Sequence, residues 1–339
     1  MARRILIAPD KYRGTLSARE AAEVISGALG PRRCMLLPMA DGGEGTAECI
    51  AAMRGNWQEV QKGVFFNAED GIIAIDSSAI VGYESDEFNM PPLLRSTAPL
   101  GKALNKLYHD FRPRKIYLGI GGTACCDVGE GLMGELNPEV AWREVIVGLA
   151  DVAVPLLPDE ASRLSALSFC RQKGFSDVEI NETKERLERL EQTYGKARSP
   201  YAGAGGGLGY AVAHLIGAQC YAGAEWLLER AEVPWEELSC VITGEGCYDE
   251  QTESGKVVAV MARAARHHGI PCYCLAGTTN IKCEQHTRGE KNHQSAETLR
   301  VISCDEYLPH LPLTPETARL RLAMAAENLT AQLTDNPPL

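Results

Sequence analysis

The residues best suited to chemistry lie in short turns that follow apolar runs. In the first turn, residues 9–14, one carboxylate (Asp10) and two cations (Lys11 and Arg13) stand before a predicted helix start. A helix N-terminus offers N–H groups that have no partner inside the helix, so this mixture suits a bound anion. The sequence therefore predicts an anion-binding turn near its start.

A second turn, residues 41–46, has the sequence Asp-Gly-Gly-Glu-Gly-Thr. Gly42 and Gly43 let backbone N–H groups come close to a ligand, and the carboxylates of Asp41 and Glu44 are groups that Mg²⁺ accepts as ligands. The same residues also fit a tight turn that binds nothing. The residues alone leave both interpretations open.

A third turn, residues 119–127, contains Gly121, Gly122, Thr123 and Asp127. It satisfies the G-x-G-x-x-A pattern of dinucleotide-binding proteins, but no clean strand ends in an acidic residue about 20 positions later. This disfavours a Rossmann-type dehydrogenase. No G-x-x-x-x-G-K-[ST] sequence occurs either, which argues against a simple P-loop fold.

Residues 243–246 begin the richest polar segment, which includes Glu245 and continues through Asp249, Gln251 and Lys256. It follows an apolar run that is typical of a buried strand. Open α/β sheets bind ligands at the carboxyl ends of their strands, which favours a ligand site here over a capped turn.

Asp151 interrupts an otherwise apolar run at residues 145–157. A carboxylate in such a place must be paired, hold a cation, or stand at a strand end facing a cleft. A turn-capping role is the alternative. Lys173 is a further candidate for contact with an anion, although a surface lysine explains it equally well.

The elements that must position these turns alternate as strand, turn and helix, which is typical of a parallel α/β sheet. A capping-box sequence begins the first helix at Ser17, and a glycine-rich run that includes Gly205 and Gly206 leads into a later one. The predicted segments are strands at 4–8, 34–38, 115–122, 240–246 and 271–277, a helix at 255–268, a solvated helix at 181–195 and an exposed loop at 278–297.

The composition excludes several classes of protein. The 339 residues include 34 basic and 45 acidic side chains, and no dense Lys/Arg stripe suggests a nucleic-acid partner. No apolar run reaches the roughly 18–20 residues of a membrane-spanning helix. The N-terminus lacks the apolar core of a signal peptide. Twelve cysteines without a C-x-x-C pair predict free thiols, so we expect a cytoplasmic protein.

Five motifs, in order along nearly the whole chain, resemble the bacterial class II glycerate kinase family. Each is weak alone, and the ordered set is specific. Residues 7–18 match the family's APDSFKGSLSA, 38–46 match P-x-A-DGGEGT, 119–131 resemble GIGGTATNDGGAG, 200–209 resemble PGAGAAGGLG, and 241–256 match VITGEGRxDxQTxxGK.

The resemblance implies ATP-dependent, Mg²⁺-assisted phosphorylation of D-glycerate, generally to 2-phosphoglycerate. It also implies an α/β fold of two domains: a Rossmann-like parallel-sheet domain from residues 1–60 and 205–339, and an inserted α/β domain from 61–204, with the active site in the cleft between them. The implied partners are a glycerate-like hydroxy-acid and a nucleotide, with no nucleic acid and no membrane; a homodimer is left open.

Position by position, Asp151 matches the aspartate of the family's CDVxNPL segment, a candidate for activating the substrate hydroxyl, and Lys173 matches the lysine of PQKGA. The implied catalytic residues are Asp151, Lys173 and Arg13; the implied substrate- and phosphate-binding residues are Asp10, Lys11, Gly42, Gly43, Gly121, Gly122, Thr123, Asp127, Gly205, Gly206, Asp249, Gln251 and Lys256; the implied metal ligands are Asp41, Glu44 and Glu245.

The chain also departs from the family pattern. Phosphoryl transfer depends on cations that face the developing charge, and two arginines of the family are missing here. Two alternatives follow: a diverged member that binds a ligand or partner without catalysis, or a kinase for another hydroxylated metabolite. The departures are Arg13 for lysine, Cys125-Cys126 for Thr-Asn, Val154 for asparagine, Cys247 for the arginine of GEGR, and the stretch 96–101, which lacks the arginine of TSRGTG.

Overall fold

The computed structural model describes residues 3–30, 34–53, 55–160, 162–249, 256–280 and 299–335. The chain divides into two compact units, unit 1 (Met1–Ala40 with Leu227–Leu339) and unit 2 (Asp41–Trp226). The divisions therefore fall at 40/41 and 226/227, whereas the sequence predicted 60/61 and 204/205. The difference arises because the 41–46 turn contacts the end of β7 and the glycine-rich run contacts the loop after β6, and both of these belong to unit 2.

Unit 1 is built on a parallel sheet with the strand order β11-β10-β9-β1-β2 among its described residues. The winding direction reverses between β9 and β1, so the loops after these strands flank a topological switch point, where open α/β sheets bind ligands. The elements are β1 Arg4–Ile7, α1 Ala18–Leu29, β2 Cys34–Leu36, β9 Leu238–Tyr248, α10 Val257–His267, β10 Cys272–Thr279, β11 Leu299–Ser303 and α11 Pro315–Asp335.

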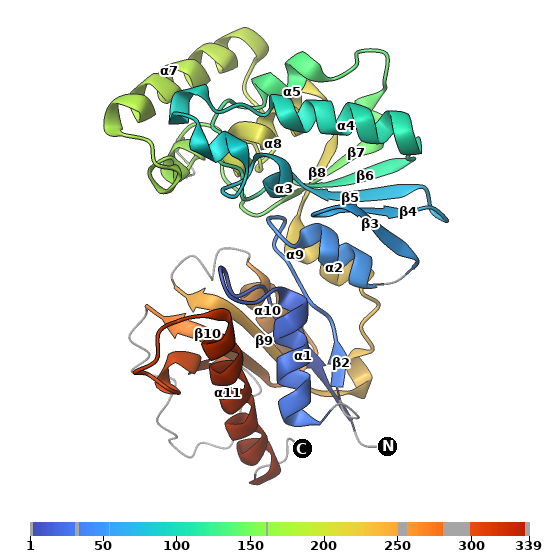
Figure 1. Ribbon diagram of the computed structural model, residues 1–339, viewed down its shortest axis with the longest axis vertical. Helices are drawn as coiled ribbons and strands as arrows, with labels where there is room; N and C mark the ends of the chain where they lie inside the picture. Colours follow the sequence, from blue (N-terminus) through green and yellow to red (C-terminus); the bar gives the residue numbers. More distant parts are fainter. Residues whose placement is uncertain are drawn as a thin grey trace. The chain divides into compact units, whose positions relative to one another are not determined.

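Helices α1 and α11 cover one face of this sheet and α10 covers the other (Figure 1). The predicted capping box begins α1: Glu20 N donates to Ser17 Oγ at 3.2 Å and Ser17 N donates to Glu20 Oε2 at 2.9 Å. Strand β10 alternates, because Leu275 joins the core formed with α1 and α11 whereas Cys274 and Ala276 pack with α10. This alternation buries the sheet on both faces.

Unit 2 is built on a mixed sheet with the order β3-β4-β5-β6-β7-β8 among its described residues. Strands β5 to β8 are parallel, as the sequence predicts, whereas β3 and β4 form antiparallel pairs that it did not predict. The elements are α2 Thr46–Met53, β3 Trp57–Gln61, β4 Val64–Asn67, β5 Ile72–Asp76, α3 Ser77–Val81, α4 Ala98–Phe111, β6 Lys115–Gly119, α5 Glu130–Glu135, α6 Trp142–Val145, β7 Ile146–Ala150, α7 Asp177–Tyr194, α8 Leu208–Tyr210, β8 Gln219–Ala222 and α9 Gly223–Arg230.

Helices α4 and α5 lie over one face of the unit 2 sheet, and α2 and α9 lie over the other (Figure 1). Strand β6 shows how the sequence specifies both faces. Ile116 and Leu118 are fully buried in the core that includes α4, whereas Tyr117 between them meets Trp226 of α9 edge to face, with ring centroids 4.7 Å apart. The period-two alternation of a strand produces this arrangement.

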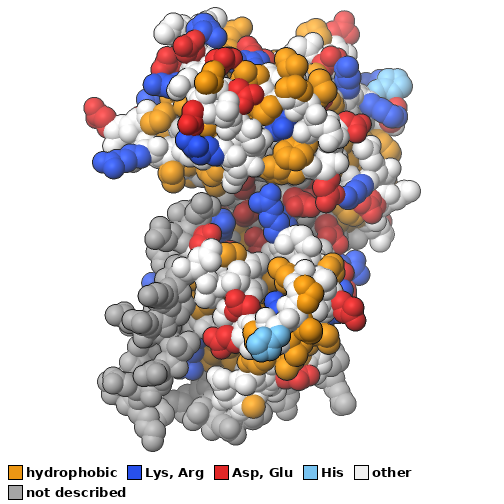
Figure 2. Space-filling view, turned by 60° about the vertical axis from the view of Figure 1, so that its left-hand side comes forward, with side chains coloured by type: hydrophobic (Ala, Val, Ile, Leu, Met, Phe, Trp, Pro, Cys, Tyr) orange, Lys and Arg blue, Asp and Glu red, His pale blue; other side chains and the backbone are white. Residues whose placement is uncertain are grey.

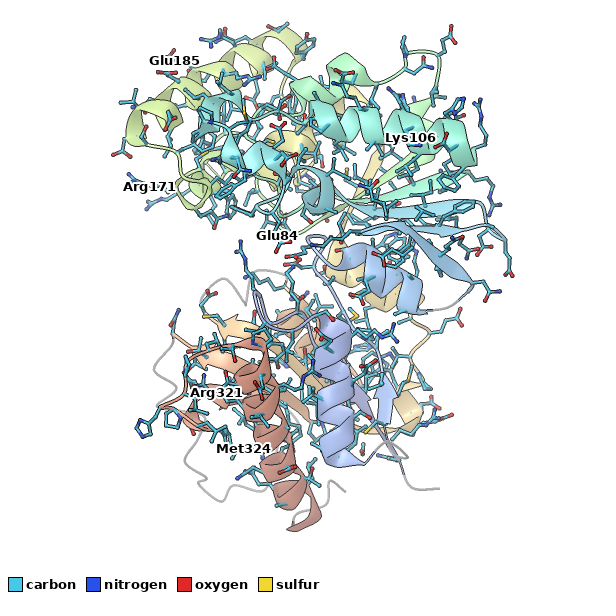
Figure 3. All side chains as sticks on the ribbon, in the orientation of Figure 1. Glu84, Lys106, Arg171, Glu185, Arg321 and Met324 are labelled. Carbon is cyan, nitrogen blue, oxygen red and sulfur yellow. The ribbon has the colours of Figure 1, made fainter. Side chains whose placement is uncertain are left out.

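The predicted solvated helix is α7, which starts a few residues early because Ser176 and Glu179 form a capping box. Glu185 projects from it into solvent, and charges of both signs are interspersed on the face of unit 2 in view (Figures 2 and 3). The first two residues of the predicted 278–297 loop instead end β10, and residues 281–297 lie outside the described part. None of the described helices has the length and apolar character needed to cross a membrane.

Candidate active site

The 41–46 turn rests directly on the carboxyl end of β7. A Cβ atom on Gly42, whose φ is +109°, would lie 2.5 Å from the carbonyl carbon of Ala150. The backbone of Gly121 donates to Gly42 O at 3.0 Å, which ties the turn to the loop after β6 as well. Glycine is required at position 42 both by the positive φ and by this close approach.

Asp76, which the sequence analysis missed, fixes the other end of the same turn. It is the last residue of β5, is 4% exposed, and accepts the N–H groups of Gly45 at 2.7 Å and Ala47 at 2.9 Å. These bonds satisfy N–H groups at the start of α2, where a carboxylate is also stabilised by the helix dipole. The signal was present in the sequence, since Asp76 ends an apolar strand just as Asp151 does.

Asp151 follows β7 immediately, so it stands at the carboxyl end of a strand as predicted. A Cβ atom on Gly121 would lie 2.4 Å from Asp151 Cγ and 2.5 Å from its Oδ2. The carboxylate therefore lies against the backbone of the loop after β6, and only glycine leaves room for it. The structure thus brings together Asp151, Gly121 and the 41–46 turn.

Lys173 is a buried cation rather than a surface lysine. It lies in the 3₁₀ turn Arg171–Lys173, is 3% exposed, and its Nζ donates to Cys125 O at 2.8 Å and Thr123 Oγ1 at 3.3 Å. Burial acts to lower the pKa of Lys173, but electrostatic interaction with nearby acidic groups, led by the Cys126 thiol, outweighs it and raises the pKa. Lys173 therefore carries a positive charge inside unit 2.

The glycine-rich run closes over Lys173. Thr123 Oγ1 donates to Gly205 O at 2.7 Å, and a Cβ atom on Gly206 would lie 2.6 Å from Lys173 Nζ. Both glycines have positive φ, +59° and +67°. The run and the loop after β6 therefore enclose the ammonium group together.

Arg95 is a second residue that the sequence analysis missed. The residue is 7% exposed, and its guanidinium donates to Lys173 O at 2.6 Å and to Phe88 O and Met90 O at 3.0 Å each. Arg95 lies one residue before the stretch 96–101, which departs from the family pattern. Arg171, two residues before Lys173, instead extends outward and pairs with Asp177 (Figure 3). Arg95 thus fixes the backbone that carries Lys173.

Asp127 is surrounded by donors from the chain itself. It is 3% exposed, and its carboxylate organises the starts of α4 and α5. The groups that donate to it are Thr97 N at 2.7 Å, Thr97 Oγ1 at 2.8 Å, Gly129 N and Gly131 N at 3.2 Å each, and Ser96 Oγ at 3.4 Å.

In unit 1, the turn after β1 is held on β9 at the switch point. Asp10 N donates to Gly244 O at 2.8 Å, and a Cβ atom on Gly246 would lie 3.1 Å from Arg13 N. Between them Tyr12 donates its hydroxyl to Leu275 O at 2.5 Å. Burial first, and then nearby negative charge, raises the pKa of Tyr12 well above its ordinary value, so the hydroxyl keeps its proton.

The remaining predicted residues are spread over both units. Lys11 N donates to Asp10 Oδ1 at 2.7 Å, Lys256 is the residue before α10, and Gln251 lies outside the described residues. Gly122 lies beside Ser78, Gly43 N donates to Asp41 Oδ1 at 3.1 Å, and Asp249 follows β9.

The predicted metal ligands lie in different units: Glu245, in β9, belongs to unit 1, while Asp41 and Glu44 belong to unit 2. The described His, Cys, Asp and Glu side chains form no group of three that could hold a metal ion.

The fold and these turns define an α/β enzyme with polar residues at the carboxyl edge of each sheet. The family model described as "Glycerate kinase family" matches residues 5–144 and 135–333. The chain belongs to the glycerate kinase family, and it is a kinase-type phosphotransferase.

Similarity to individual relatives supports this family membership. A glycerate kinase of Halalkalibacterium halodurans and a glycerate 2-kinase of Escherichia coli are each 30% identical, over 81% of this chain and 85% of theirs. An uncharacterized protein of Mycobacterium bovis is 28% identical over 99% of this chain and 93% of its own. The crystal structure of a putative glycerate kinase 2 from Salmonella typhimurium shares the fold, with a TM-score of 0.70, 24% identity and full coverage of both chains.

Proposed function

We propose that this protein is an ATP-dependent kinase that phosphorylates D-glycerate to 2-phosphoglycerate. Family membership and the names of the relatives support the substrate. The observation that carries the proposal is the meeting of Asp151 with two glycine turns at the carboxyl edge of the unit 2 sheet. The described cysteines are all free thiols, which supports a cytoplasmic setting.

Asp151 is assigned as the general base. When the substrate hydroxyl attacks the terminal phosphorus of ATP, its O–H proton passes to the Asp151 carboxylate as the new P–O bond forms and the bond to ADP breaks. The close contact with Gly121 restricts where the carboxylate can lie. A base held in this way needs little reorganisation at the moment of reaction, which favours the transfer.

Lys173 supplies fixed positive charge near the loop after β6. Its buried ammonium interacts more strongly with an anion than a solvated one does, because the local dielectric constant is low. The hydrogen bond from Arg95 to the carbonyl group of Lys173 keeps the Lys173 backbone in place. We assign Lys173 to the substrate carboxylate or the transferred phosphoryl group, and Gly42, Gly43, Gly121, Gly122, Thr123, Gly205 and Gly206 to the loops that form this site.

In unit 1, we assign Asp10, Lys11, Arg13, Asp249, Gln251 and Lys256 to anion and phosphate binding at the switch point. That position is where open α/β sheets bind ligands. The cationic side chains of Lys11, Arg13 and Lys256 suit polyphosphate. Asp10, at 8% exposure, is held against the backbone of Lys11 and orders the turn.

Mg²⁺ fits the residues present. It is bound by one or two carboxylates together with substrate phosphates rather than by an all-protein cage, so a cluster of three is not required. Asp41 and Glu44 offer such carboxylates on one turn of unit 2, and Glu245 offers one in unit 1. Bound with the nucleotide, the ion neutralises phosphate charge.

A coupled assay of ADP release with ATP, Mg²⁺ and D-glycerate tests the proposal. We expect turnover with D-glycerate and much less with L-glycerate or with hydroxy-acids that lack the second hydroxyl. Stabilisation of the protein by ATP in a thermal-shift experiment, with no turnover on any hydroxy-acid, would instead support a ligand-binding relative. Turnover on another hydroxylated metabolite alone would replace D-glycerate as the substrate.

A further inference from the structure

Two cysteines face each other beside Lys173. The sulfur atoms of Cys126 and Cys170 are 3.5 Å apart, and both side chains pack with Phe175 in a small apolar cluster. Cys126 stands in the loop after β6, in the Cys-Cys pair that replaces Thr-Asn of the resembled family. Cys170 lies three residues before Lys173, whose backbone N–H donates to Cys170 O at 3.0 Å. The proposed phosphoryl transfer uses neither thiol.

We propose that Cys126 and Cys170 are a peroxide-responsive thiol pair that closes to a disulfide in the folded protein and displaces Lys173. Formation of the disulfide is independent of the proposed function. Only its consequence for turnover rests on that function.

The surroundings make Cys126 the nucleophile. Its hydrogen bond with Cys170, and then the nearby ammonium of Lys173, lower the pKa of Cys126 against the effect of burial, while Asp127 opposes them weakly. The hydrogen bond with Cys126 raises the pKa of Cys170, and burial raises the pKa of Cys125. Thiolate character decides which cysteine reacts with peroxide. Cys126 is 6% exposed, whereas Cys170 is fully buried, so Cys126 is also the sulfur that a small peroxide reaches.

The oxidation balances with hydrogen peroxide as the oxidant. The Cys126 thiolate attacks one peroxide oxygen, the S–O bond forms, the O–O bond breaks, and the departing hydroxide takes a proton to become water. The Cys170 sulfur then attacks the sulfenic sulfur, and the departing hydroxide leaves as water with the Cys170 proton. Two thiols thus lose two electrons and two protons, and one peroxide becomes two waters.

We expect closure of the bond to move Lys173. A disulfide has an S–S distance of about 2.0 Å, so the sulfurs must approach by about 1.5 Å from their 3.5 Å separation. The loop that holds Cys126 also holds Cys125, whose carbonyl group accepts a hydrogen bond from Lys173 Nζ. The turn that follows Cys170 holds Lys173 itself. A misplacement of about 1 Å in a catalytic arrangement can cost about 10²-fold in rate, so we expect a loss of that order.

The test is peptide mapping of the folded protein after brief treatment with hydrogen peroxide and alkylation of the remaining thiols. Trypsin releases Cys170 in peptide 164–171 and Cys126 in peptide 116–143. We expect these two peptides to be linked without reductant and separate after dithiothreitol. Cys125→Ser, a matched control in the same peptide, keeps the link, and Cys126→Ser or Cys170→Ser abolishes it. A link that survives in Cys126→Ser, or that forms only in denatured protein, overturns the proposal.

Two further readouts separate this inference from the proposed function. The oxidation rate of Cys126 should rise at lower pH than the pKa of about 8.5 of an ordinary thiol; a rate that rises only near that value overturns its assignment as the nucleophile. Turnover of the wild type should fall about 10²-fold on oxidation and recover with dithiothreitol. Peroxide treatment should leave the turnover of Cys170→Ser unchanged. Linked protein with full turnover overturns the displacement of Lys173. A protein inactive before treatment counts against the proposed function, and mapping still decides the thiol pair.

Discussion

Asp127 lies in the loop after β6 and Asp151 follows β7, the neighbouring parallel strand of unit 2, yet the chain surrounds the two carboxylates differently. Asp127 accepts hydrogen bonds from Thr97, Gly129 and other groups at the starts of two helices. Asp151 lies instead against the backbone of Gly121, where the 41–46 turn also meets the sheet. A match to a family motif therefore does not by itself fix the role of a carboxylate. We expect Asp127 to hold the loops and Asp151 to take part in the chemistry.

Replacing Asp151 should have the largest effect on activity. Asp151→Asn keeps the shape of the side chain but removes the base, so we expect kcat to fall about 10²–10⁴-fold with little change in KM. The melting temperature should stay close to that of the wild type. Steady-state kinetics with D-glycerate and ATP measure the effect, and a variant with near-normal kcat would make Asp151 a structural residue.

Adding one methyl group beside Asp151 should reproduce part of that loss. In Gly121→Ala the new Cβ would overlap the Asp151 carboxylate, so the base must move, and we expect a fall of about 10²-fold in kcat. Gly134→Ala is the matched control, because nothing lies within 4 Å of a Cβ there. Equal kinetics for the two alanine variants would show that the contact does not position the base.

Replacing Asp127 should act on stability. Asp127→Ala leaves several buried donors without an acceptor, and each costs about 1–3 kcal/mol, so we expect the free energy of unfolding to fall by about 3 kcal/mol or more. Urea denaturation measures it, with the exposed Asp110→Ala as a control that should leave the midpoint in place. A stable Asp127→Ala protein that has lost phosphate binding would restore the ligand-binding role implied by the family resemblance.

Arg95 should show a smaller, mixed effect. Arg95→Met removes charged hydrogen bonds to four carbonyl groups, and we expect a loss of about 2 kcal/mol in stability together with reduced turnover. Arg171→Met, on the solvent-exposed side of the turn that contains Lys173, should change neither stability nor turnover. If both arginine variants behave alike, Arg95 does not position Lys173.

The sequence predicted what local patterns encode. The capping box at Ser17, the parallel strands and the position of Asp151 at a strand end were all readable from periodicity and turn residues. It missed Arg95, whose partners are brought close only by folding, one of them 78 positions along the chain. The two units also divide the chain at other positions than the sequence predicted, since contacts between the 41–46 turn and β7 join segments about a hundred residues apart.

We expect this chain to transfer the terminal phosphoryl group of ATP to D-glycerate at the edge of the unit 2 sheet where Asp151 stands. Phosphorus-31 NMR of the protein with ATP, Mg²⁺ and D-glycerate tests it most directly, because it identifies the product as well as the reaction. We predict that the terminal phosphate signal of ATP declines as ADP and 2-phosphoglycerate appear in equal amounts, and that Asp151→Asn slows both at least about 10²-fold. A folded wild-type protein that yields no phosphate ester of glycerate would show that D-glycerate is not its substrate.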